Sequence, residues 1–249
     1  MSLFDDLDRL PGRLLVASDF DGTLAELGID PDATVAVVGA LEALRQLTAR
    51  PDVEVAVVSG RSMADLVRMV PLDGVTLVGE HGAAWQGEHP AAPDGFDRVR
   101  AVLEEVAASH PGSRVEVKAA SLVVHTRGME PRQEIEALGS AVEALHSLGH
   151  DNLHIGKHIV DVGFVEISKG LVVERLRHSL GCRHVVFAGD DTTDETVFER
   201  LRPRDVGIKV GPGPTSARHR VASPTDVVAI LQYLAGRAFR PDTATAPAG

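Results

Sequence analysis

The sequence predicts an α/β fold, a parallel sheet with helices on both faces, that is interrupted by a smaller α+β insertion. Short runs rich in Val, Leu and Ile alternate with helical patterns near the start of the chain, and the same alternation returns near its end. Continuous apolar runs of this length are typical of parallel strands buried on both faces. The middle of the chain instead places helices among paired strands, which is typical of an antiparallel sheet covered on one face.

The predicted core consists of two parts, 1–83 and 168–240. Each apolar run in these parts ends at Gly, Asp or Ser, which marks the end of a buried strand. Strands are expected at 13–19, 53–60, 75–82, 184–191 and 205–211. The helical patterns between and after them lie at 33–49, 62–69, 170–180, 194–201 and 225–235. The tail 241–249 is rich in Ala, Thr and Pro and is predicted to be disordered.

The predicted insertion covers 84–167 and is a domain in its own right. Its helices are expected near 96–109 and 131–148. Its short strands are expected at 114–120, 121–127, 152–156 and 158–167. A chain of 249 residues is long enough for this domain and the core together.

Composition excludes several classes of function. Acidic residues outnumber basic ones by 36 to 25, a net charge of −11 that argues against a general nucleic-acid binder. Cys182 is the only cysteine, so nothing indicates an oxidising compartment. No apolar run approaches the roughly 18 residues that a membrane span needs, and the acidic stretch 1–9 does not resemble a signal peptide. We therefore expect a cytoplasmic enzyme with a small-molecule partner and no membrane partner; the sequence does not predict protein partners.

The motif DFDGTL, residues 19–24, directly follows the first apolar run. Ligands of parallel α/β sheets bind at the carboxyl ends of the strands, so Asp19 and Asp21 are expected at that edge. One carboxylate can attack phosphorus while the other handles the proton of the leaving group. The alternative, a solvated acidic turn, does not explain why two acids and a Gly-Thr turn follow a buried strand.

This motif resembles the first motif of the haloacid dehalogenase superfamily of phosphatases, which implies a Rossmann-like core. The resemblance implies that Ser59, at the end of the second run, holds a phosphoryl oxygen and that Lys169 neutralises charge shared with the nucleophile. In the string GDDTTDE it implies that Asp190 binds Mg²⁺ and that Asp194 holds a metal-bound water or Lys169. The implied metal ligands are Asp19, the main-chain carbonyl of Asp21, and Asp190; Asp191 has no assigned role.

Longer strings resemble the trehalose-6-phosphate phosphatase family across nearly the whole chain. They are SGR at 59–61, GEHG at 79–82, VEVKAASLVVHTR at 115–127, GKHIVD at 156–161 and GDDTTDE at 189–195. The resemblance implies Mg²⁺-dependent hydrolysis of trehalose 6-phosphate through an aspartyl-phosphate, with the insertion as a cap. Glu116 and Lys118 would grip the distant glucose, while Arg61 and His81 would face the sugar phosphate.

One position departs from the family pattern. After the GK segment the family has a glutamate, whereas this chain has Asp161, and Glu166 is out of register. The shorter side chain leaves open a related phosphatase that acts on another disaccharide, glucosyl-polyol or aminocyclitol phosphate. A phospho-accepting signalling module is disfavoured by the large insertion, and a catalytically silent sugar-binding protein is disfavoured because every catalytic position is filled.

Overall fold

The computed structural model describes residues 2–28, 33–88, 92–151, 153–164 and 167–238. The chain divides into two compact units, a core unit (Met1–Gln86 and Ile167–Gly249) and an inserted unit (Gly87–Glu166). The insertion was predicted to begin at residue 84, but strand β4 (Ala84–Trp85) pairs with β3 (Val75–Gly79), so these residues belong to the core unit. The tail 241–249, predicted to be disordered, lies outside the described residues.

The sheet of the core unit has the order β11-β10-β9-β1-β2-β3-β4. All neighbouring pairs in it are parallel except β3 with β4. The other strands of this sheet are β1 (Leu14–Ser18), β2 (Val53–Val58), β9 (His184–Gly189), β10 (Val206–Val210) and β11 (His219–Val221). Because β1 lies between β2 and β9, the residues that follow these three strands meet at one edge of the sheet.

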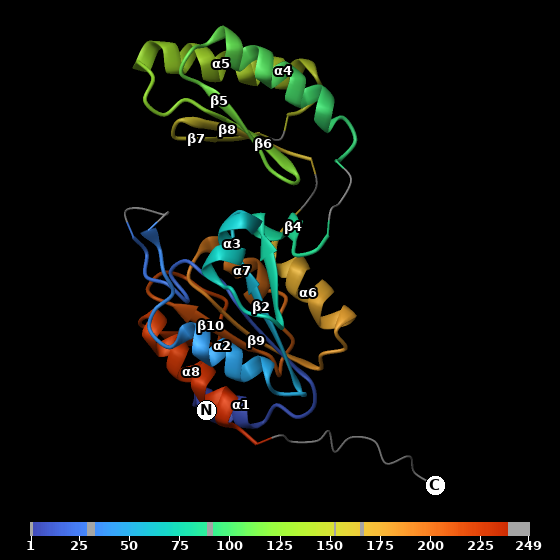
Figure 1. Cartoon of the computed structure of the whole chain (residues 1–249), viewed down its shortest axis with the longest axis vertical. Coiled ribbons are helices and arrows are strands. Elements are labelled where there is room, and N and C mark those ends of the chain that lie inside the picture. The colour runs from blue at the N-terminus through green and yellow to red at the C-terminus, as the bar shows by residue number, and fades with distance from the viewer. Residues whose placement is uncertain (1, 29–32, 89–91, 152, 165–166, 239–249) are drawn as a thin grey trace. The chain divides into compact units, whose positions relative to one another are not determined.

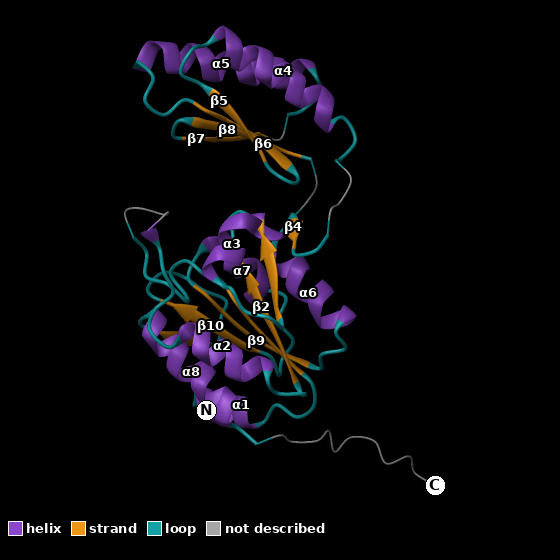
Figure 2. Ribbon diagram, in the orientation of Figure 1, coloured by secondary structure: helices purple, strands orange, loops and turns teal. Residues whose placement is uncertain are grey.

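Helices cover both faces of this sheet (Figures 1 and 2). One face packs against a large apolar core that includes Leu7, Leu44, Leu66 and Val227. These residues come from α1 (Leu3–Asp8), α2 (Ala40–Thr48), α3 (Met63–Met69) and α8 (Pro224–Gly236). The other face packs against Val172, Leu176 and Phe198 of α6 (Lys169–Ser179) and α7 (Thr192–Phe198). The α/β expectation is confirmed.

Two helix starts differ from the prediction. The helix expected from residue 33 begins at Ala40, because Gly39 takes a left-handed φ of 88° and Ala36 instead bridges to Ala25. Val35 and Val38, which the pattern placed in the helix, are 75% and 98% exposed. The helix expected from 194 begins two residues earlier, because the Asp191 side chain caps it. The elements α1, β4, β11 and a short 3₁₀ turn (Glu80–Gly82) were not predicted.

The inserted unit is an antiparallel sheet of order β5-β6-β8-β7. Its strands are β5 (Arg114–Val117), β6 (Ser121–His125), β7 (Leu153–Gly156) and β8 (Ile159–Gly163). Helices α4 (Phe96–Ser109) and α5 (Pro131–Ser147) lie against one face, where Leu122 and Val162 pack against Leu103 and Leu145. The sheet register places Glu116, Val123, Asp161 and His154 in one row across the four strands. Since side chains alternate along a strand, this row faces away from the helices.

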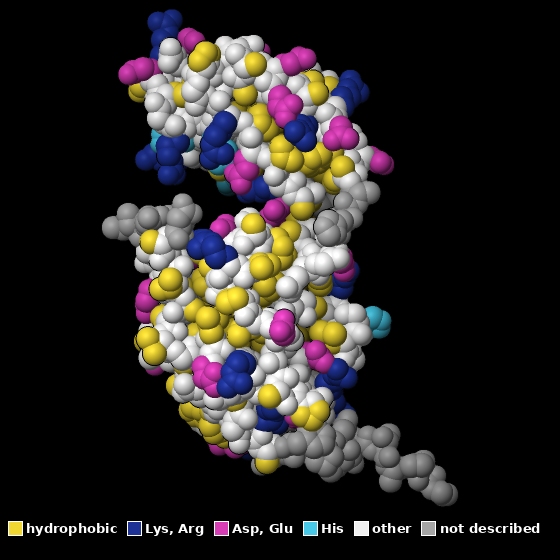
Figure 3. All heavy atoms as spheres, in the orientation of Figure 1, with side chains coloured by type: hydrophobic (Ala, Val, Ile, Leu, Met, Phe, Trp, Pro, Cys, Tyr) yellow, Lys and Arg dark blue, Asp and Glu magenta, His cyan; other side chains and the backbone are white. Residues whose placement is uncertain are grey.

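The surface carries charges of both signs. On the face of the core unit in Figure 3, basic and acidic side chains are scattered among neutral and apolar ones. No helix in the described part of the chain combines the length and apolar character that a bilayer crossing demands.

Candidate active site

Asp19 directly follows β1 and is 5% exposed. Its main-chain N–H donates to the carbonyl of Ala188 on β9 (2.9 Å), which continues the parallel pairing by one residue. One carboxylate oxygen accepts from the N–H of Phe20 (2.6 Å), and the other contacts Nζ of Lys169 (2.7 Å). The carboxylate is therefore fixed by backbone and side-chain donors at the edge where β1, β2 and β9 end.

Lys169 lies between two carboxylates. Its ammonium is 2.7 Å from Asp19 and 2.8 Å from Asp194, and its side chain is 1% exposed. It begins α6, which Ser168 caps by accepting from the N–H of Leu171. A side chain at Gly170 would collide with the carbonyl of Thr196, so this glycine allows α6 to lie against α7 and Lys169 to reach Asp194.

Burial has the largest single effect on the pKa values of Asp19, Lys169 and Asp190. The pKa of Asp19 is raised to about 7, chiefly by burial; Lys169 opposes the rise and the Asp194 charge adds to it. The ammonium of Lys169 is also penalised by burial, but Asp19 and Asp194 outweigh that penalty and raise its pKa. The pKa of Asp190 is raised by burial and by Asp194, and Lys209 and Lys169 act against the rise. Negative charge is thus crowded here and attracts cations.

The string GDDTTDE forms the junction between β9 and α7. Asp194 accepts from the N–H of Asp191 (2.9 Å), and the Asp191 carboxylate accepts from the N–H of Thr192 (2.7 Å). This reciprocal capping assigns Asp191 a structural role that the sequence left open. Gly22, at a φ of 69°, packs so closely on Asp190 that any side chain there would collide with its carboxylate.

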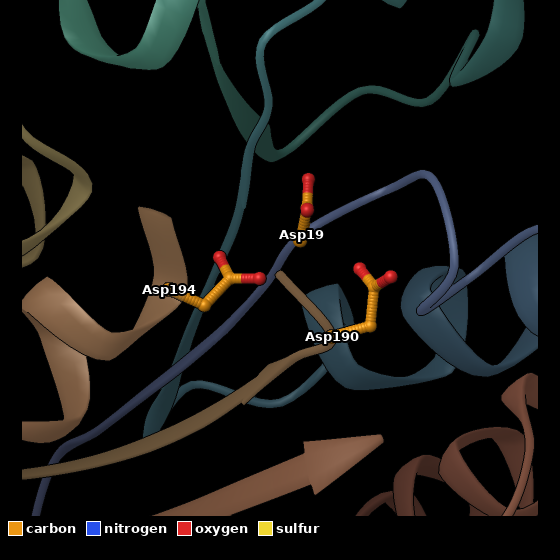
Figure 4. A group of neighbouring side chains, drawn as sticks. All are labelled: Asp19, Asp190 and Asp194. Atoms are coloured by element: carbon orange, nitrogen blue, oxygen red, sulfur yellow. The ribbon is translucent and has the colours of Figure 1, made fainter. Parts of the chain in front are cut away.

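Asp19, Asp190 and Asp194 form a cluster that could hold a metal ion. Each offers a carboxylate oxygen, and the three atoms lie within 4.8 Å of one another. Figure 4 shows the three carboxyl groups near one another, Asp19 from the segment after β1 and Asp190 and Asp194 from the junction of β9 and α7. An all-oxygen, anionic donor set suits a hard divalent cation. The Asp21 carboxylate is not in this cluster; it receives two hydrogen bonds from Arg61, at 2.7 and 2.5 Å.

Ser59, Arg61 and His81 come from two adjoining loops. Ser59 is buried at the end of β2, and the N–H groups of His81 and Glu80 donate to the carbonyls of Ser59 and Arg61 (both 2.9 Å). Glu80 and His81 have left-handed φ values of 51° and 57°, which are uncommon outside glycine. The His81 ring lies against Gly60, where a Cβ would be 2.5 Å from its Cε1. Strain of this kind is typical of functional loops.

These residues line one pocket of about 510 Å³ in the core unit, a volume that suits a small-molecule ligand. Of the predicted core residues, the wall includes Asp19, Asp21, Ser59, Arg61, His81, Lys169 and Asp190. Asp194 stands behind them, fully buried against Lys169. The wall also contains Leu27, Gly28 and Thr34. The sequence analysis assigned no role to any of these three, and it placed Thr34 in the predicted helix 33–49.

The three predicted residues of the inserted unit lie on or beside its sheet. A carboxylate oxygen of Glu116 on β5 is 2.6 Å from Nε2 of His125, which lies diagonal to it on β6. Asp161 of β8 belongs to the same row as Glu116 on the face without helices. Lys118 follows β5 and is half-buried, and its N–H donates to Ser121 (3.0 Å). Glu166, considered as a substitute for Asp161, lies outside the described residues.

The sequence motifs that suggested a phosphatase lie in a segment of the chain that a protein-family model matches. The model of the trehalose-phosphatase family matches residues 17–227, which include the inserted unit and most of the core unit. This chain belongs to the trehalose-phosphatase family. It shares its fold with a haloacid dehalogenase-like hydrolase of Bacteroides thetaiotaomicron, with a TM-score of 0.65 at 14% identity, covering 89% of this chain and 99% of that one.

Individual proteins to which this chain is similar include trehalose-phosphate phosphatases. The chain is 34% identical to a bifunctional trehalose-6-phosphate synthase/phosphatase of Thermoproteus tenax, over 93% of this chain and 33% of that protein. It is 33% identical to a trehalose-phosphate phosphatase of Mycobacterium tuberculosis, over 87% of this chain and 60% of that protein. The chain thus spans a third to three-fifths of the length of these two relatives. Aspergillus fumigatus trehalose-6-phosphate phosphatase shares the fold, with a TM-score of 0.68 at 24% identity, covering 94% of this chain and 96% of that one.

Lys209 is a residue near the site to which the sequence analysis assigned no role. It lies in β10, is 5% exposed, and donates a hydrogen bond to the main-chain carbonyl of Asp190. The available signal was a lysine inside the buried run VGIKV, where an apolar residue is expected.

Proposed function

We propose that this chain is a Mg²⁺-dependent phosphatase that hydrolyses trehalose 6-phosphate to trehalose and phosphate. The observation that carries the proposal is the buried Asp19, fixed by Lys169 beside two further aspartates in a pocket of substrate size. Membership of the trehalose-phosphatase family supports the substrate. The inserted unit supports it as well, because its sheet carries acidic and basic groups that can bind sugar hydroxyls.

In the first step, an oxygen of Asp19 attacks phosphorus and the bond from phosphorus to the sugar oxygen breaks. The sugar oxygen takes a proton from Asp21, which leaves an aspartyl-phosphate and free trehalose. In the second step, Asp21 takes a proton from water, and the water oxygen displaces Asp19 from phosphorus to release phosphate. Both oxygens of Asp21 accept hydrogen bonds from Arg61 in this structure, so one of these bonds must open before Asp21 can carry and donate the proton.

The negative charge of the phosphoryl group and of the carboxylates around it must be neutralised during both steps. Lys169 contacts Asp19 and can balance the charge shared between that carboxylate and the phosphoryl group. The hydroxyl and adjacent N–H groups at Ser59 can bind a phosphoryl oxygen. Asp19 and Asp190, together with the main-chain carbonyl of Asp21, would hold Mg²⁺, and Asp194 adds a further oxygen to the cluster. When bound, Mg²⁺ supplies positive charge that offsets the crowded carboxylates and phosphate.

We propose that the inserted unit acts as a cap that selects the sugar. Core residues that handle phosphate cannot distinguish one sugar ester from another, so selection requires groups that meet the distant glucose. Glu116, Lys118 and Asp161 are the candidates, since a carboxylate accepts from a hydroxyl and an ammonium donates to one. Glu116 is already oriented by His125.

Asp161 favours one second candidate, a phosphatase for another disaccharide, glucosyl-polyol or aminocyclitol phosphate. Its side chain is one methylene shorter than the family's glutamate, so it would suit a different hydroxyl arrangement. Substitution Asp161→Glu separates the two candidates. It is expected to raise activity on trehalose 6-phosphate only if this chain's natural substrate is a different ester.

The experiment that tests the function is phosphate release from a panel of sugar phosphates, with Mg²⁺ and with excess chelator. We expect trehalose 6-phosphate to be hydrolysed fastest, and activity to disappear with chelator and return with added Mg²⁺. Faster turnover of a glucosyl-polyol or aminocyclitol phosphate would favour the second candidate. Full activity in chelator would contradict the metal requirement, and release from none of the esters would contradict the function.

A further inference from the structure

Lys209 is a buried cation to which the proposed mechanism gives no part. Its side chain lies in the sheet next to Gly189, its register partner on β9, one residue before Asp190. In the described part of the chain it forms no ion pair with a carboxylate. Its polar contact is the hydrogen bond that its ammonium donates to the carbonyl of Asp190.

The position is an unfavourable one for a lysine. Every residue of β10 is buried, and Val206, Ile208 and Val210 fill the apolar core on one face of the sheet. Lys209 points to the other face, as does Gly207, which packs against Leu201 and Phe198. An ammonium without a paired carboxylate costs stability there, so an apolar residue would suit the fold better.

The contact of Lys209 completes the restraint of a single peptide group. That group joins Asp190 to Asp191, and its N–H donates to the Asp194 carboxylate (2.9 Å). Its carbonyl accepts from Lys209. A peptide plane held at both ends cannot rotate, so the backbone torsions on either side of it are restricted. The Asp190 side chain leaves the backbone directly before this plane, and its direction toward the cluster depends on it.

We propose that Lys209 is a positioning residue that holds Asp190 in its metal-binding direction. This inference rests on the proposed function, in which Asp190 is a metal ligand. Lys209 does not line the pocket and acts through the backbone of Asp190. Groups that orient a metal ligand from behind commonly change metal affinity by about 10- to 100-fold when removed.

Loss of the Lys209 charge and loss of its hydrogen bond should change the affinity for Mg²⁺ in opposite directions. The inference can therefore be tested. A positive charge near a cation site weakens cation binding, so loss of the charge alone would tighten Mg²⁺ binding. Loss of the restraint on Asp190 would weaken it. We expect the restraint to dominate, because a misdirected carboxylate removes one of three oxygen donors.

The experiment is calorimetric titration of the metal-free protein with Mg²⁺, without substrate. Lys209→Met removes the donor and the charge in a similar volume, and Lys209→Arg keeps both. Arg132→Met is the matched control, because it removes one positive charge from a side chain of α5 that is 92% exposed. Thermal unfolding in chelator checks that each variant is folded; if Lys209→Met is not, Lys209→Leu, which also lacks a donor and a charge, replaces it.

We expect Lys209→Met to weaken Mg²⁺ binding by about 10- to 100-fold. Arg132→Met should bind like the wild type, and Lys209→Arg more tightly than Lys209→Met. Tighter binding by Lys209→Met, or unchanged binding with only a lower melting temperature, would overturn the proposal. A wild type that binds Mg²⁺ but hydrolyses no sugar phosphate would refute the proposed function alone, and a wild type that binds no Mg²⁺ would refute both.

Discussion

The pocket of the core unit and the helix-free face of the inserted sheet, called here the open face, differ in how exposed and how well paired their charged side chains are. In the pocket, Asp19, Lys169 and Asp194 are each at most 5% exposed and contact one another or the backbone. On the open face, the side chains of Glu116 and Asp161 are partly exposed. Glu116 pairs with His125, and in the described residues Asp161 has no polar side-chain partner.

This difference separates two kinds of chemistry. Buried groups that hold one another in place are suited to a reaction that needs fixed geometry and strong electrostatics. Partly exposed polar groups retain donors and acceptors for a ligand that arrives with its own hydroxyls. The core unit therefore carries the features of a reaction site, and the inserted unit carries those of a recognition surface. The predictions below test this division.

The largest effect is expected for Asp19→Asn, which removes the proposed nucleophile from the core unit. A carboxamide cannot form the acyl-phosphate bond, so phosphate release should fall by at least about a thousandfold on every ester. Phosphate release and circular dichroism are the measurements, and the spectrum should not change. Retention of a tenth of the wild-type rate would exclude Asp19 as the nucleophile.

Lys118→Ala tests the recognition surface. Loss of a charged donor to a sugar hydroxyl should cost about 2–4 kcal/mol in kcat/KM on trehalose 6-phosphate. Hydrolysis of p-nitrophenyl phosphate, which has no sugar, should change little. Equal losses on both substrates would mean that the substitution damages the core unit, and no loss on either would mean that Lys118 is only a surface residue.

Gly22→Ala should do the reverse and affect both substrates alike. The added methyl group collides with the Asp190 carboxylate, and a displacement of about 1 Å in a reacting group can cost about a hundredfold in rate. Gly181→Ala is the matched control, since Gly181 has a similar φ of 64° with no atom within 4 Å of an added Cβ. It should lose stability but keep its rate. A rate loss confined to trehalose 6-phosphate in Gly22→Ala would contradict the division between the units.

The smallest effect is expected at Cys182, which tests whether burial away from the pocket also shifts the pKa of a side chain. Burial raises its pKa from 9.0 to about 11, yet it lies outside the pocket. A thiol whose pKa is raised by folding stabilises the fold below pH 9, and that contribution is lost as the pH rises toward 11. Alkylation by iodoacetamide at pH 9 should be slow in the native protein and fast in urea. Rapid alkylation of the native protein would mean that the thiol is accessible.

The α/β class, the order of most elements and the gathering of the core aspartates at one edge of the sheet could be predicted from the sequence alone. Apolar runs that end in Asp19, Ser59 and Asp190 place these residues at one edge of a parallel sheet, since such strands all end on the same side. Lys169 could be assigned only by resemblance, because a lone lysine in sequence is ordinarily a solvated one. The start of α2 was mispredicted because the apolar spacing of Val37, Leu41, Leu44 and Leu47 suggests one helix from residue 33, whereas Gly39 and the bridge at Ala36 delay its start to Ala40.

The partners of the charged groups could not be predicted from the sequence. Periodicity and motifs do not predict that Arg61 holds the Asp21 carboxylate, or that Asp194 closes the carboxylate cluster while Asp191 caps α7. Nor do they predict that Lys209 reaches the backbone of Asp190. These contacts join residues far apart in the chain or compete within one loop. Which partner each group takes depends on distances of a few ångströms, and the packing of the whole fold sets those distances.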